Sequence, residues 1–133
     1  MTQRFTPEQI SELKPNEVFV YGSNQYAIHG AGSARKAIDF GATYKDVPMG
    51  LCGQSYGIIT KSFSNEPVTI GFIGSQVRVL YEFAKLRPDL TFYVTKIGTA
   101  LAGFSVEEIG DIFRKLTALI GLPSNIILPK EFH

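Results

Sequence analysis

Two glycine-rich loops contain the residue types best suited to holding an anion. The first loop, 22–32, lies between an apolar strand-like run, 18–21, and an alanine-rich stretch, 33–40, with helical spacing. Strand, glycine loop and helix together point backbone N–H groups and the positive end of a helix dipole at a negative charge. This order predicts a pocket for a phosphate-bearing small molecule, although the same glycines also suit a tight turn that binds nothing.

A second loop, 98–103, also follows an apolar run and precedes a capped helix start, and Lys61 follows a third apolar run. If these runs are parallel strands, their carboxyl ends meet at one edge of a sheet. Both loops and Lys61 would then face one crevice. Such a pair of loops suits a ligand with two phosphates, or with a phosphate and a ribose. Asn24 is a candidate partner for a ribose hydroxyl because its amide both donates and accepts hydrogen bonds.

Three other residues have reactive or charged side chains, and each has a simpler interpretation. His29 could be a general base or a phosphate ligand, or a loop histidine bonded to the backbone. Cys52 could be a thiol nucleophile, or a small apolar residue. Lys96 could contact a phosphate, or lie in solvent. Two histidines and one cysteine form no ligand cluster at a recognised spacing, so we expect neither a metal site nor a cofactor.

The composition limits the classes of protein that the chain can represent. A length of 133 residues fits one domain, 1–133, and the net charge is +1. Without a dense basic run, extended binding to nucleic acid is not favoured. One cysteine fits a reducing compartment, and no signal segment or membrane span is recognised. We therefore expect a soluble, cytoplasmic protein, and the sequence does not define its oligomeric state.

The apolar periodicity predicts alternating helices and strands. The expected helices are 6–13, 33–40, 76–86 and 105–120, and the expected strands are 18–21, 54–60, 90–97 and 125–128. Residues 43–53 are expected to form a loop, and 68–72 a short extended piece. Ser75 is the expected cap of the third helix, and its expected buried stripe is Val79, Leu80, Phe83 and Leu86. This order predicts an α/β sandwich with a largely parallel central sheet.

The two loops and the lysine together resemble a known family. Tyr21-Gly22-Ser23-Asn24, followed by His29-Gly30-Ala31-Gly32-Ser33-Ala34, resembles the first ligand loop of macrodomains, which bind ADP-ribose. Residues 97–104 are similar to their second, phosphate-binding loop. Residues 56–61 resemble the strand-plus-lysine segment of the branch that removes ADP-ribose from glutamate or DNA. The order of these segments also resembles short, uncharacterised bacterial and phage proteins described as macrodomain-like.

The resemblance implies a three-layer α/β/α fold and an ADP-ribose-type nucleotide ligand. In that branch, the lysine corresponding to Lys61 attacks the anomeric carbon of the distal ribose, assisted by an acid in the second loop. The acid's position is occupied here by Ala102, which cannot transfer a proton. A hydrolase of ADP-ribosyl linkages, a non-catalytic binder of a nucleotide signal and a protein interaction module therefore remain as alternatives. The implied ligand-binding residues are Gly22, Ser23, Asn24, His29, Gly30, Ala31, Gly32, Gly98, Thr99, Ala100, Leu101, Ala102, Gly103 and Phe104.

Overall fold

The structure is a computed structural model that describes residues 4–24, 32–41, 49–62, 66–99 and 102–133. Its strands are β1 (Glu17–Asn24), β2 (Gly50–Cys52), β3 (Ser55–Lys61), β4 (Thr91–Val94) and β5 (Ile126–Ile127). Its helices are α1 (Gly32–Asp39), α2 (Ile70–Leu86), α3 (Val106–Ile120) and the short 3-10 helix η1 (Lys130–Phe132). The strands form one sheet in the order β2-β3-β1-β4-β5.

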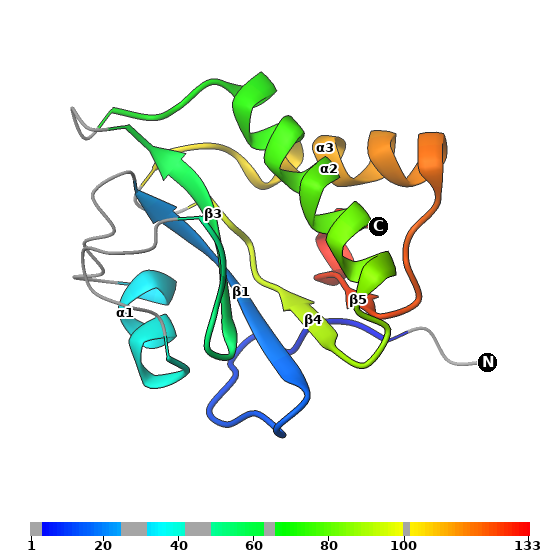
Figure 1. Cartoon of the computed structure of the whole chain (residues 1–133). Helices are drawn as coiled ribbons and strands as arrows, with labels where there is room; N and C mark the ends of the chain where they lie inside the picture. The colour runs from blue at the N-terminus through cyan, green and yellow to red at the C-terminus, as the bar shows by residue number, and fades with distance from the viewer. Residues whose placement is uncertain (1–3, 25–31, 42–48, 63–65, 100–101) are drawn as a thin grey trace.

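The sheet is mostly parallel and is covered on both faces. β1 runs parallel to β3 and to β4, and β4 runs parallel to β5, whereas the edge strand β2 is antiparallel to β3. α1 lies on one face, and α2 and α3 lie on the other (Figure 1). The predicted three-layer α/β/α sandwich with a mostly parallel sheet is confirmed. The sequence missed β2, which has only three residues.

β1 supplies apolar side chains to both layers because successive residues of a strand point to opposite faces. Val18 and Val20 belong to the larger core with α2 and α3. Phe19 and Tyr21 pack against Ala37 on the α1 side. This arrangement explains why the run 18–21 is apolar throughout rather than alternating with polar residues.

The predicted N-terminal helix at 6–13 is wrong. Among the described residues, 4–16 contain no helix. The backbone N–H of Thr6 donates to the carbonyl of Leu128 (2.9 Å), and its hydroxyl donates to the carbonyl of Ile127 (3.0 Å). Thr6 therefore joins the segment to the end of β5 instead of capping a helix. So short a helix is also only marginally stable by itself, so these tertiary bonds decide the conformation.

The third predicted helix begins earlier than the sequence indicated, so 70–72 are helical, and only Val68 and Thr69 of the expected extended piece 68–72 precede the helix. Thr69 is the cap, and its hydroxyl accepts a hydrogen bond from the N–H of Phe72. Ser75 lies inside α2, where its hydroxyl donates to the carbonyl of Phe72. The buried face consists of Ile73, Gln76, Val77, Leu80, Tyr81 and Ala84. Val79 and Leu86 are 56% and 78% exposed, so half of the predicted stripe is wrong.

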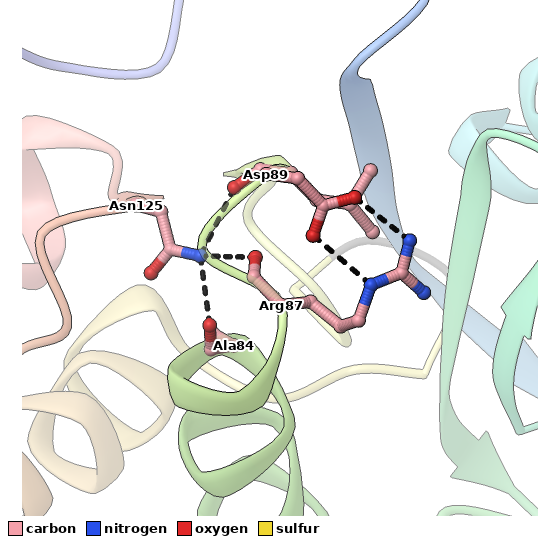
Figure 2. A network of polar contacts seen from close by, with 5 residues as sticks. Ala84, Arg87, Asp89 and Asn125 are labelled. Carbon is pink, nitrogen blue, oxygen red and sulfur yellow. Dashed lines mark hydrogen bonds and ion pairs between the residues drawn. The ribbon is translucent and has the colours of Figure 1, made fainter.

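The ends of α2 and α3 are fixed by side-chain hydrogen bonds. Ser105 and Glu108 form the predicted capping box at the start of α3. The amide of Asn125, just before β5, lies within 3.0 Å of the carbonyls of Ala84, Arg87 and Leu90 (Figure 2). The carbonyls of Ala84 and Arg87 also accept the backbone N–H groups of Arg87 and Leu90. Asn125 thus adds to the hydrogen bonds that fix the path of the chain from α2 to β4.

Candidate functional site

Two of the residues singled out from the sequence, Asn24 and Lys61, are neighbours at the carboxyl edge of the sheet. They are register partners at the ends of the parallel strands β1 and β3, where the register shifts between Ser23 and Asn24. Both residues are half-buried. Residues that carry an amide and an amine are therefore neighbours at the edge where parallel α/β sheets bind ligands.

The three strand ends meet closely at Gly22, Thr60 and Gly98. A Cβ atom added at Gly22 would lie 3.2 Å from the backbone nitrogen of Gly98 and 3.3 Å from Thr60 Oγ1. The Thr60 hydroxyl donates to the carbonyl of Ser23 (3.1 Å), which links β3 to β1 at this point. The absence of a side chain at Gly22 therefore allows the second glycine loop to approach the first strand.

The second glycine loop folds back on itself before α3. Gly98 has a φ of 72° and Gly103 a φ of 83°, a region that favours glycine. The N–H of Phe104 donates to the carbonyl of Gly98 (2.9 Å), and the Thr99 hydroxyl donates to the carbonyl of Lys96 (2.7 Å). The Phe104 bond joins the described residues on either side of the loop, and Gly98 lies against β1 and β3 near their carboxyl ends.

The start of α3 is less suited to an anion than the sequence suggested. Glu107 and Glu108 lie in its first turn, and the Glu108 carboxylate accepts the backbone N–H of Ser105 at 3.0 Å. The helix dipole already has negative partners from its own chain. An anion at this edge would therefore be held by the backbone of the glycine loop rather than by the helix terminus.

A buried glutamine supports the strand that ends in Lys61. On the outer edge of β3, Ile59 lies between β2, which pairs with residues 55–57, and the segment 66–68, which pairs with the last two residues of the strand. There the side chain of Gln76 accepts the N–H of Ile59 (2.7 Å) and donates to its carbonyl (2.9 Å). Gln76 is buried in α2 and replaces a neighbouring strand. Sequence reasoning missed it, although a glutamine within an apolar helix face is a usable signal.

A pocket of about 520 Å³ lies on the α1 side of the sheet, next to the ends of β4 and β5. Its walls include Phe19, Lys36, Thr95, Lys96 and Pro129, together with the N-terminal segment 6–11. This volume is typical of sites for small molecules. The Thr95 hydroxyl donates to the carbonyl of Val20 (2.8 Å), so one wall of the pocket is bonded to β1.

The charges around this pocket are balanced. Lys96 Nζ lies 2.6 Å from a carboxylate oxygen of Glu131 and 3.2 Å from one of Glu8. These carboxylates raise the pKa of Lys96, and Lys96 lowers the pKa of Glu131. Lys36 has a weak ion pair with Asp39 at 3.9 Å. The pocket therefore suits a neutral polar group, such as a nucleobase or a ribose, better than a phosphate.

Other titratable groups are occupied by structural contacts. Asp111 lies 2.6 Å from Arg114, which lowers the pKa of the Asp111 carboxyl, so Asp111 is ionised at neutral pH and is a poor proton donor. Burial raises the pKa of Tyr21 to about 12, so its phenol stays neutral. Cys52 lies in β2, half-buried, with Sγ 3.4 Å from the carbonyl of Gly41. Ala102 is buried.

Several predicted site residues lie outside the described part of the chain, namely His29, Gly30, Ala31, Ala100 and Leu101. Within the described part, no group of three or more histidine, cysteine, aspartate or glutamate side chains could hold a metal ion. The same residues contain no helix long and apolar enough to cross a membrane.

Comparison with known proteins relates the fold, but not the sequence, to solved structures. No protein-family model and no curated protein matches the chain. It is similar to a macrodomain protein from Streptomyces coelicolor, with a TM-score of 0.59 and 12% identity over 91% of this chain and 92% of the other. A protein of unknown function from Bacteroides thetaiotaomicron gives the same TM-score and identity over 90% of each chain. At this identity the similarity establishes a macrodomain-like fold alone.

Proposed function

We propose that the chain binds an ADP-ribose-type nucleotide across the carboxyl edge of its sheet. The observation that carries this proposal is the pairing of Asn24 with Lys61 at the ends of β1 and β3. The backbone of the glycine loop after β4 lies against β1 beside this pair. In the proposed complex the distal ribose lies near Asn24 and Lys61, and the phosphates lie along the glycine loop.

The pocket beside β4 and β5 supplies a place for the rest of such a ligand. Its volume of about 520 Å³ and its balanced charges fit a nucleoside rather than a phosphate. It lies at the carboxyl ends of neighbouring strands in the same sheet. A ligand with a nucleoside at one end, two phosphates and a second ribose would match this order of surfaces.

Calorimetric titration with ADP-ribose tests the proposal, with ADP and NAD as comparison ligands. ADP-ribose should bind with measurable heat, and Asn24→Ala should weaken binding about tenfold because a bond to a ribose hydroxyl is lost. Asn16→Ala is the matched control, since Asn16 is exposed and precedes the opposite end of β1. No heat with any of the three ligands, or equal loss in both variants, would contradict the proposal.

We further propose that any reaction at this edge stops once Lys61 has formed a covalent bond to the ribose. A deprotonated lysine amine can attack the anomeric carbon of the ribose, so that a C–N bond forms and the linked group leaves with the electrons of its C–O bond. Ring opening then gives an imine, and release of the lysine requires water and proton transfer. Residues 98–104 include no acidic side chain, and Asp111 is bound to Arg114. A covalent adduct or simple binding is therefore favoured over repeated hydrolysis.

A further inference from the structure

The surface of α2 and α3 has a groove whose lining includes neither the glycine loops nor the strand ends of the proposed site. This groove, of about 590 Å³, runs between the two helices. At one end it is lined by Gly71, Gly74 and Glu108, and at the other by Lys115 and Leu119. Gly71 and Gly74 contribute no side chains to this end of the groove, and among the described residues nothing lies within 4 Å of a Cβ added at Gly71. Space for a side chain is therefore open at this end, which we refer to as the hollow.

Exposed apolar side chains lie along the groove. Leu119 is 72% exposed and projects at the end of the groove away from the hollow. Of the six large exposed apolar residues in the described part of the chain, Ile70 and Leu119 line the groove. Exposed apolar side chains along a groove are typical of an interface.

The two ends of the groove complement each other in shape and in charge. α2 and α3 run in the same sense, since Gly74 lies near Ile112 and Lys85 Nζ donates to the carbonyl of Ile120. The hollow therefore lies beside the acidic residue Glu108, and the projecting Leu119 lies beside the basic residue Lys115. Glu108 and Leu119 are about 16 Å apart along α3, from the rise of an α-helix.

We propose that the groove is the interface for a second copy of this chain, related by a two-fold axis. In a two-fold dimer, where one residue of the first copy contacts a second residue of the other copy, the same contact is made again with the two copies exchanged. Leu119 of each copy then fills the hollow at Gly71 and Gly74 of the other. The same rotation brings Lys115 of each copy opposite Glu108 of the other. The occupant is a second copy because the surface is complementary to itself.

Sedimentation equilibrium of the full chain, with three variants, tests this dimer. Leu119→Asp removes the projecting side chain, and Gly71→Leu fills the hollow without a clash inside one copy. Each should weaken the dimer by about 10- to 100-fold, the equivalent of one buried leucine. Leu86→Asp is the control, because Leu86 is 78% exposed but lies outside the groove.

Thermal unfolding of each variant shows separately whether the fold is kept. Gly71→Leu should leave folding intact or stabilise it, since leucine favours a helix more than glycine does. A wild-type protein that stays monomeric at all attainable concentrations would overturn the proposal. So would a dimer that withstands either groove variant while folded, or one that Leu86→Asp weakens as much as Leu119→Asp does.

Discussion

At the scale of single residues, Lys61 and Ala102 together define which chemistry is available. Lys61 ends β3 beside Asn24, where its amine can reach a ligand at the sheet edge. Ala102 is buried, at the position where the resemblance to macrodomain hydrolases implies an acid. With Lys61 as the proposed nucleophile, the lack of an acid in the loop 98–104 favours a single covalent event over turnover.

A single covalent event at Lys61 predicts the outcome of borohydride trapping with a peptide that carries ADP-ribose on glutamate. The wild type should gain one adduct per chain by mass spectrometry, located at Lys61, and should release no more than one peptide per chain. Lys61→Ala should give no adduct while still binding ADP-ribose. Lys85→Ala is the control, since Lys85 is exposed near the end of α2 and lines neither the sheet edge nor the pocket. Trapping that persists in Lys61→Ala would exclude this role, and repeated turnover would show that Ala102 is no obstacle.

At the scale of the elements, β3 depends on α2 to hold its last residues in place. The Gln76 side chain bonds both the backbone N–H and the backbone carbonyl of Ile59, at an edge of β3 that β2 does not reach. At the next residues the segment 66–68 lies beside β3, where Lys61 pairs with Pro67. Gln76 and this segment together therefore position the lysine. The helix therefore contributes to the site without touching it.

Gln76→Ala should destabilise the fold by about 1–3 kcal/mol, because it leaves a buried N–H and a buried carbonyl unsatisfied. It should also weaken ADP-ribose binding, since Lys61 and Asn24 lose their register. Urea unfolding and calorimetry measure the two effects. Ser75→Ala, one residue earlier on the exposed side of α2, should change neither. Equal stability of Gln76→Ala and wild type would contradict this explanation.

The elements also show which structure the sequence could and could not predict. Apolar runs identified β1, β3, β4 and the region of β5, because strands covered on both faces need continuous apolar residues. The start of α2 was hidden by Gly71 and Gly74, which weaken the helical signal although Thr69 is an effective cap. β2 and the N-terminal segment depend on pairing with distant parts of the chain, which local sequence does not encode.

The site was predictable in part for the same reason. Asn24, Lys61 and Gly98 each follow an apolar run, and the parallel sheet brings such positions to one edge. The contacts of Thr60, Gln76 and Thr95 could not be predicted, because they depend on which strands are neighbours and where β2 ends.

At the scale of the whole molecule, ion pairs hold the N-terminal segment and the C-terminal helix η1 together beside the pocket. Lys96 bridges Glu8 of the N-terminal segment and Glu131 of η1. Phe132 is fully buried and stacks on Phe113 with ring centroids 5.0 Å apart. The segment that forms a wall of the pocket is thus held by residues from the far end of the chain.

This arrangement predicts a pH dependence of stability. Lys96 holds the pKa of Glu131 below its usual range, so the ion pair stabilises the fold at neutral pH and is lost as the pH falls and the carboxylate is protonated. The free energy of unfolding should therefore fall more between neutral and acidic pH in the wild type than in Lys96→Met. Lys14→Met, at an exposed position of the same N-terminal segment, should follow the wild type. Urea titrations at each pH measure the difference, and parallel curves for wild type and Lys96→Met would argue against it.

The most direct test of nucleotide binding at the sheet edge is to map amide chemical shifts in the ¹⁵N-labelled protein during titration with ADP-ribose. The proposal predicts shifts concentrated at the ends of β1 and β3, around Asn24 and Lys61, and along residues 95–104. Residues of the α2–α3 groove should not move at the same ligand concentrations. Absence of shifts at the strand ends, or shifts confined to the groove, would contradict the proposed site.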